Sequence, residues 1–307
     1  MGVKKEDEVI IPPLSFVATA NAISHLGASP HFVDIEPYSL GLCPSALEKR
    51  LNNIAFRKGD NVFNKFTGNK IAAVIPVHVF GIPAKILEIK KIFLKWNIPL
   101  VEDAAEALGS SISISENNKK HCGCIGDIGT LSFNGNKIIT TGMGGAILTN
   151  NKQIYLKAKH LASTAKIKSK WDYIHDMLGY NYRLPSLNAS IGYSQMKKIK
   201  ILINKKRELF KMYKKVFSNS EILTLVSEQT NSRSNYWLQT VILKPQFKYL
   251  AKMILKKCYE NKIYIRPAWK PLHQLSYFKK FPKMNLNKTN SLSQRVLNLP
   301  SSSFLYK

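Results

Sequence analysis

The sequence lacks the features that define several classes of protein. It has only four cysteines, which are too few and too scattered for a disulfide framework: Cys43, Cys122, Cys124 and Cys258. Its first residues contain no apolar segment of the kind that forms a secretory signal, and its longest apolar stretch, around residues 71–77, is too short to span a bilayer. We therefore expect a cytoplasmic protein with free thiols and no membrane contact.

Two of the cysteines stand next to a histidine, in the run His121-Cys122-Gly123-Cys124. Thiolates and imidazole bind zinc, but a zinc site needs three or four ligands. The sequence has no second Cys/His pair that could supply the remaining ligands. We therefore expect no bound metal and interpret these cysteines as free thiols.

Acidic residues are scarce, since 19 Asp and Glu stand against 46 Lys and Arg and give a formal net charge of +27. A basic excess of this size can mark a nucleic-acid-binding protein. Here the lysines are spread over the whole chain, and in the densest stretch, 197–215, apolar residues recur at helical spacing, so that the lysines fall mostly on a solvated helix face. We favour a lysine-rich surface that steers an anionic substrate, and we expect no nucleic-acid partner.

Short apolar runs alternate with helical patterns over the first two-thirds of the chain. This alternation is typical of a mostly parallel sheet covered by helices, an α/β fold. The expected strands are Glu8–Ile11, His31–Asp34, Ala72–His78, Pro99–Glu102, Thr130–Phe133 and Gly145–Thr149. The expected helices are Thr19–Leu26, Ser45–Leu51, Ala84–Trp96 and Ile154–Ser163.

The pattern changes after the basic helix. Trp237–Leu243 and Lys262–Ile265 have the composition of strands, and Phe247–Asn261 has that of a helix between them. Because of this change, and because 307 residues exceed the usual size of one domain, we predict two domains. A large α/β domain covers residues 1–195, and a linking helix with a small α+β domain covers residues 196–307.

An acidic group follows one of the expected strands, in Val101-Glu102-Asp103-Ala104-Ala105-Glu106. Ligands of open α/β sheets bind at the carboxyl ends of the strands, so Asp103 is a candidate site residue. Asp is also a good helix N-cap, and Ala-Ala-Glu-Ala could begin a helix, so the two readings weigh about evenly on this segment alone.

A lone lysine, Lys137, lies in a polar, glycine-rich turn between two apolar strands. Such a turn lets the backbone approach a bulky ligand, and its hydroxyls and N–H groups, with Ser132 among them, can bind a phosphate. An enclosed lysine reaches its neutral, nucleophilic form more easily than one in water. An exposed lysine in an ordinary hairpin-like turn is the alternative. Together with Asp103, the turn favours a pyridoxal 5'-phosphate (PLP) site, because PLP needs a lysine, an acid and phosphate donors.

The sequence resembles the DegT/StrS-type sugar aminotransferases, which are PLP enzymes of fold type I, from Glu8 to about Pro300. The resemblance rests on several separate blocks in the right order: Asp7–Pro13, Phe32–Ile35, Pro76–Gly81, Glu102–Ala105, Ser132-Phe133 with Lys137, and Gly179–Arg183. Three further blocks look like the 4-aminotransferases of the legionaminic-acid and bacillosamine routes: Phe133–Gly142, Trp171–Asp176 and Arg266–His273. Those enzymes aminate C4 of a UDP-linked 4-keto-6-deoxy-N-acetylhexosamine, usually with glutamate as amino donor.

The resemblance implies a role for each candidate residue. Lys137 would hold PLP as a Schiff base and move the proton during catalysis, and Asp103 would keep the pyridinium nitrogen protonated. Glu106 would lie near the ring or its phenolic oxygen, where many relatives carry Gln, and Ser132 would contact the phosphate. Phe16 would stack on the ring, although a core aromatic is an equal alternative. Asn181 would reach the cofactor of the partner in a homodimer. The remaining candidates have two equal readings, packing or sugar contact: His78, His175 and His273.

One element of the family is missing from the sequence. Relatives carry an N-terminal strand and a Ser-Gly-Thr-Ala turn that binds the PLP phosphate at a helix N-terminus, and no such turn occurs here. The resemblance therefore implies a fold that lacks its first strand. The first hypothesis is an active nucleotide-sugar aminotransferase, and the alternative is an inactive remnant or interaction protein of the same fold.

Overall fold

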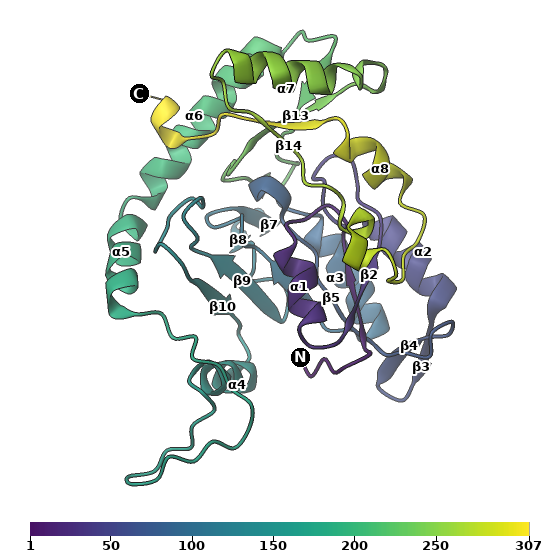
Figure 1. Cartoon of the computed structure of the whole chain (residues 1–307), viewed down its shortest axis with the longest axis vertical. Coiled ribbons are helices and arrows are strands. Elements are labelled where there is room, and N and C mark those ends of the chain that lie inside the picture. Colours follow the sequence, from purple (N-terminus) through teal and green to yellow (C-terminus); the bar gives the residue numbers. More distant parts are fainter. Residues whose placement is uncertain (307) are drawn as a thin grey trace.

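The central feature of the protein is a mostly parallel β-sheet. The structure, a computed structural model, describes residues 1–306. Two three-stranded parts, in the orders β2-β1-β5 and β6-β9-β10, are joined by isolated parallel bridges that pair Val74 with Leu100 and Val77 with Asp103. Only the last pair, β9 with β10, is antiparallel in these two parts (Figure 1). The strands are β1 (Glu8–Ile11), β2 (Ser29–Phe32), β5 (Ile71–Val74), β6 (Val101–Asp103), β9 (Ile128–Ser132) and β10 (Gly145–Leu148).

Helices cover both faces of this sheet because successive strand residues point to opposite sides. On β1, Ile10 packs into a core with α2 (Pro44–Ile54) and α3 (Ile86–Trp96). Its neighbours Val9 and Ile11 pack into a second core with α1 (Ala18–Ser24). Pro44 begins α2, where the missing N–H of proline costs no helical hydrogen bond. The predicted fold class, a mostly parallel sheet between helices, is confirmed.

Two β-hairpins extend from the sheet region, and the sequence analysis did not predict them. The first pairs β3 (Ala55–Lys58) with β4 (Asn61–Asn64). The second pairs β7 (Ser111–Ser115) with β8 (Asn118–His121), and β12 (Ser232–Arg233) adds to β7. This last pairing ties the C-terminal part of the chain to the sheet region.

The C-terminal part of the chain begins with two helices, α5 (Ser186–Met196) and α6 (Ile199–Phe217). A four-stranded antiparallel sheet follows, in the order β11-β13-β15-β14. Its strands are β11 (Leu223–Leu225), β13 (Gln239–Leu243), β14 (Arg266–Pro267) and β15 (Val296–Leu299), and its helices are α7 (Leu250–Glu260) and α8 (Asn287–Ser293). The predicted strand Lys262–Ile265 is wrong, because pairing with β15 begins only at Arg266.

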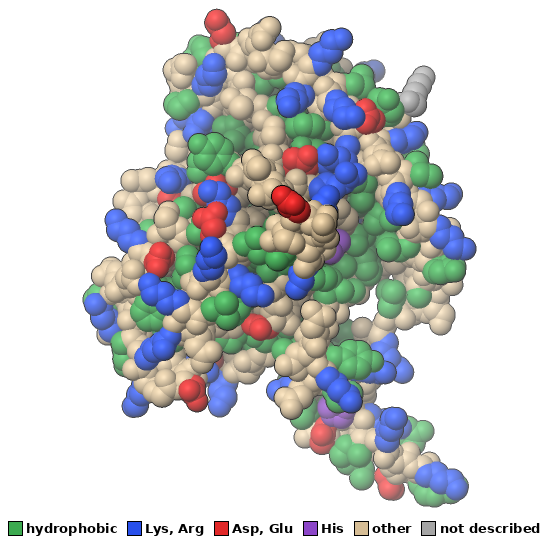
Figure 2. All heavy atoms as spheres, turned by 180° about the vertical axis from the view of Figure 1, so that it is seen from behind, with side chains coloured by type: hydrophobic (Ala, Val, Ile, Leu, Met, Phe, Trp, Pro, Cys, Tyr) green, Lys and Arg blue, Asp and Glu red, His purple; other side chains and the backbone are tan. Residues whose placement is uncertain are grey.

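The helix α6 departs from the expected distribution of lysines at one position. Most of its lysines are exposed or half-exposed, but Lys206 is buried with Ile203, Leu209 and Phe210. Figure 2 shows Lys and Arg side chains scattered over the face that it displays rather than gathered in one stripe. The basic excess is thus spread over that surface, with one lysine inside the protein.

An extended arm, defined as residues 164–183, projects from the body after α4 (Lys152–Ala162) (Figures 1 and 2). It carries large exposed side chains: Trp171 is 78% exposed, Tyr173 83% and Leu178 85%. Among residues 1–306, no helix is both long and apolar enough to cross a membrane.

Candidate active site

Lys137 lies in the loop that joins β9 to β10, and its amine contacts two side chains from distant parts of the chain. Its Nζ is 3.5 Å from Oε1 of Glu106 and 4.1 Å from the centroid of the Trp237 ring. The Lys137 side chain is only 12% exposed, and that of Glu106 is 5% exposed. The alternative reading of Lys137 as a solvent-exposed turn lysine is therefore wrong.

Glu106 is the acid that faces this amine. Its other oxygen, Oε2, accepts a hydrogen bond of 2.8 Å from the backbone N–H of Phe80. Phe80 has a positive φ of 57°, which is uncommon for a bulky residue and aims its N–H at the carboxylate. Burial, opposed by the charge of Lys137, raises the pKa of Glu106 to about 7, and the nearby Asp103 adds to the rise. Glu106 can therefore exchange a proton near neutral pH.

Asp103 ends β6 and is held by its own set of donors. The Thr19 hydroxyl donates to Oδ2 over 2.7 Å, and the Ala105 N–H donates to Oδ1 over 3.1 Å. The residues after Asp103 form turns rather than a helix, so the reading of Asp103 as a helix N-cap is wrong. Asp103 is close enough to Glu106 to influence its pKa, which brings Asp103, Glu106 and Lys137 into one cluster.

The other predicted site residues lie around this cluster or away from it. Ser132 ends β9, and its Oγ accepts a hydrogen bond of 3.3 Å from Asn134 N. Phe16 is 54% exposed and its ring lies 6.4 Å from that of Trp269, so Phe16 is not a core aromatic. Asn181 belongs to the arm and lines a separate hollow of about 850 Å³, in which Lys137 takes no part. The roles predicted for Ser132, Phe16 and Asn181 stay predictions.

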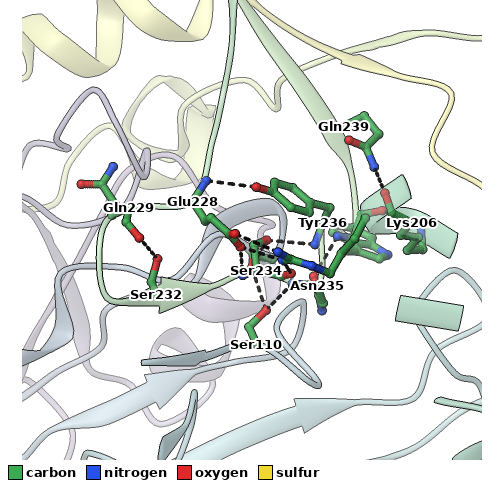
Figure 3. A network of polar contacts seen from close by, with 12 residues as sticks. Ser110, Lys206, Glu228, Gln229, Ser232, Ser234, Asn235, Tyr236 and Gln239 are labelled. Atoms are coloured by element: carbon green, nitrogen blue, oxygen red, sulfur yellow. Dashed lines mark hydrogen bonds and ion pairs between the residues drawn. The ribbon is translucent and has the colours of Figure 1, made fainter. Parts of the chain in front are cut away.

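Residues 234–237 of the C-terminal part form hydrogen bonds with the backbone next to Lys137 and Glu106. These residues were not predicted from the sequence. The Asn235 side chain donates to the backbone oxygens of Glu106 and Leu108, both over 2.9 Å. The Trp237 indole N–H donates to Asn136 O, next to Lys137, over 2.7 Å. Figure 3 shows Ser234, Asn235 and Tyr236 grouped with Ser110 and Glu228 in one polar network. The segment thus connects both partners of the Lys137–Glu106 contact.

Glycine is required at position 81, where this segment contacts the loop after β5. Gly81 has a φ of +86°, and a Cβ there would lie 2.0 Å from Oδ1 of Asn235. Gly81 O in turn accepts hydrogen bonds from the hydroxyls of Ser110 and Ser234, over 2.8 and 2.9 Å. Any side chain at position 81 would displace Asn235 from the backbone of Glu106.

The buried Lys206 of α6 also holds this segment. Its ammonium donates to Trp237 O over 3.0 Å and also to Ser301 O. Burial lowers the pKa of Lys206 to about 8. Helix α6 is therefore joined by a hydrogen bond to Trp237, the residue whose ring contacts the Lys137 amine.

A second buried acid, Glu102, anchors the loop that leads into β9. Its oxygens accept from the N–H groups of Gly123 (2.9 Å), Ile125 (2.6 Å) and Gly126 (2.6 Å). His78 Nε2 lies 3.0 Å from Oε2 of Glu102. Since Ala84 N donates to Nδ1 of His78, the imidazole proton is on Nε2 and points at Glu102. His78, one of the histidines left open by the sequence, has a packing role here.

Comparisons with known proteins show what the chain as a whole is similar to. The model of the DegT/DnrJ/EryC1/StrS aminotransferase family matches residues 1–307. GDP-perosamine synthase of Escherichia coli O157:H7 is 31% identical over 304 residues, covering 98% of this chain and 75% of that protein. The UDP-4-amino-4,6-dideoxy-N-acetyl-beta-L-altrosamine transaminase of Campylobacter jejuni is 30% identical over 298 residues, covering 96% and 74%. Among solved structures, Helicobacter pylori PseC, an aminotransferase involved in the biosynthesis of pseudoaminic acid, superimposes with a TM-score of 0.85 at 25% identity, covering 98% and 76%.

Proposed function

Because the chain belongs to the DegT/DnrJ/EryC1/StrS aminotransferase family, we propose that it transfers an amino group from glutamate to the C4 keto group of a UDP-linked 4-keto-6-deoxy sugar. The family consists of PLP-dependent sugar aminotransferases, so the cofactor is pyridoxal phosphate. The observation that carries the proposal is the enclosed Lys137 amine, 3.5 Å from Glu106 and in one cluster with Asp103.

The side chains of this cluster fit the cofactor. Lys137 offers an amine for the aldehyde, Asp103 a carboxylate for the ring nitrogen, and Ser132 a hydroxyl at the end of the neighbouring strand for the phosphate. When bound, PLP supplies an electron sink that stabilises negative charge on the substrate carbon. Phe16, which is half-exposed, would offer a face for the ring.

The protein's own residues would then perform three tasks. Lys137 would hold the cofactor and move a proton between its Nζ and the substrate carbon. Asp103 would keep its position for the ring nitrogen through the hydrogen bonds from Thr19 and Ala105. The 234–237 segment would exclude water from the amine by covering it with the Trp237 ring.

We also propose that the protein is a homodimer and that each chain has two domains. A homodimer is supported by the apolar side chains that the arm exposes, since Trp171 and Leu178 are 78% and 85% exposed. In such a dimer Asn181 would reach the partner's cofactor. The division into residues 1–195 and 196–307 is part of the same proposal, with α6 as the linking helix.

The choice of sugar nucleotide is tested by comparing the two candidate substrates in separate reactions. The purified protein is incubated with PLP, glutamate and either a UDP-linked or a GDP-linked 4-keto-6-deoxy sugar, and the amino sugar and 2-oxoglutarate are measured by chromatography. We expect both products with the UDP sugar. Products with the GDP sugar alone would overturn the UDP assignment, and products with neither would favour the alternative of an inactive protein of the same fold.

A further inference from the structure

We propose that Glu106 is the proton partner of Lys137: it holds the ammonium before the cofactor arrives and accepts the proton that the amine must lose to become a nucleophile. This inference rests on the proposed function, which makes Lys137 the cofactor-binding lysine. It adds to Glu106 a role toward the lysine, beyond its expected contact with the cofactor ring.

The geometry isolates the two groups as a pair. Lys137 Nζ lies 3.5 Å from Oε1 of Glu106, and the two side chains are 12% and 5% exposed. The second oxygen of Glu106 is already used by Phe80 N, so Oε1 is the atom available to the amine. On its other side, the amine faces the ring of Trp237. A ring face attracts a cation but cannot accept its proton, so Glu106 is the acceptor in contact.

The charged groups around Glu106 come from two elements. Lys137 faces it from the loop between β9 and β10, and Asp103 faces it from the end of β6. The other neighbours, Phe80 and Asn235, meet it with neutral groups, a backbone N–H and a side-chain amide. The charge state of Glu106 therefore depends on burial, on Lys137 and on Asp103.

The proton transfer balances within the pair. One N–H bond of the Lys137 ammonium breaks, an O–H bond forms at Oε1 of Glu106, and the pair keeps its net charge. The amine left behind carries the lone pair that attacks a carbonyl carbon. Because burial raises the pKa of Glu106 to about 7, the carboxylate can take up this proton at neutral pH.

The charge state of Glu106 decides how strongly it holds the Lys137 ammonium. Burial raises the pKa of Glu106 to about 7, so below this pH the carboxyl is neutral and attracts the ammonium only weakly. Above pH 7, Glu106 is a carboxylate that holds the ammonium, so labelling of the amine should stop increasing with pH. Glu106→Gln removes this charge at every pH but keeps the side-chain shape and an oxygen for Phe80 N, so labelling of Lys137 should keep increasing in this variant.

The experiment measures this profile without any cofactor. The unloaded full-length protein is labelled with limiting acetic anhydride between pH 6 and 9, digested, and the acetylation of Lys137 is quantified by mass spectrometry. We expect the wild-type rate to level off above pH 7. The Glu106→Gln rate should exceed it about tenfold at pH 8 and match it within about twofold at pH 6, because the pKa of Glu106 is about 7 and its charge is present only above that pH.

The surface pair of Lys85 and Glu88 provides the control, because its atoms are 4.0 Å apart and both side chains are solvent-accessible. Glu88→Gln should leave the Lys137 profile unchanged. Superimposable Lys137 profiles for wild type and Glu106→Gln would overturn the proposal. If Glu106→Gln does not fold, the wild type alone decides, since a rate that rises steadily through pH 7 to 9 contradicts a proton partner. Labelling needs no PLP, so a wild type that failed to bind PLP would refute the proposed function and leave this test intact.

Discussion

Glu102 should be one of the most sensitive positions of the protein, although it lies outside the cluster around Lys137. Its carboxylate is completely buried and accepts from three backbone N–H groups and from His78. Burial alone would raise the pKa of Glu102, but the hydrogen bonds from His78, Gly126 and Gly123 lower it. The ionised side chain thus holds the loop before β9 in place through hydrogen bonds. The strand β9 leads to Lys137.

The substitution Glu102→Gln keeps the volume but replaces one acceptor oxygen by an NH₂ group. Whichever way the amide turns, two donors lose their acceptor: Ile125 N and Gly126 N on one side, or Gly123 N and His78 on the other. His78 cannot easily move its proton, because its Nδ1 already accepts from Ala84. An unsatisfied buried donor costs about 1–3 kcal/mol, so the loss of unfolding free energy should be about 4 kcal/mol.

Urea unfolding followed by circular dichroism measures this loss, with the free energy obtained by linear extrapolation. The exposed Glu88→Gln serves as the control and should change the free energy by less than about 0.5 kcal/mol. A Glu102→Gln protein within about 1 kcal/mol of wild type would refute the reasoning, because it would mean that the donors around Glu102 do not need its charge.

Two further predictions use the same unfolding assay. Gly129→Ala would place a Cβ 2.0 Å from the backbone oxygen of Gly123. This substitution should lower the free energy of unfolding by at least about 2 kcal/mol. A urea midpoint equal to that of the wild type would contradict the packing of this loop. For Lys206, burial lowers the pKa from 10.5 to about 8, so between these values the unfolded chain binds more protons than the folded one. Stability should therefore rise by up to about 3 kcal/mol as pH increases through this window, and below pH 8, where Lys206 is protonated in both states, its contribution should no longer change with pH. A Lys206→Met protein that kept this dependence would count against the assignment.

The elements that the sequence predicted well are those with a strong apolar pattern. The strand β1 was predicted at its observed bounds, and α3 within two residues of its start. The predicted strand Lys262–Ile265 failed for a physical reason. Ile263, Tyr264 and Ile265 have the composition of a strand, but a strand exists only where a partner pairs with it, and β15 reaches only Arg266 and Pro267.

The cluster of Asp103, Glu106 and Lys137 could be anticipated because parallel strands place their carboxyl ends along one edge of the sheet. Trp237 could not, since it is 101 residues from Asn136, with which it shares a hydrogen bond, and no local pattern encodes that contact. Lys206 carried a usable signal. It stands three residues after Ile203 and four before Phe210, on the apolar face of α6. A lysine at this helical spacing interrupts the row of apolar residues, which indicates that its side chain is buried with them.

The identity of the cofactor-binding lysine is the central claim, and one chemical measurement tests it directly. The wild-type protein is incubated with PLP, reduced with borohydride and digested, and the lysine that carries the pyridoxyl group is located by mass spectrometry. We expect the group on Lys137, together with a visible absorption band before reduction that Lys137→Ala abolishes. A pyridoxyl group on any other lysine, or on none, would contradict the account of this site.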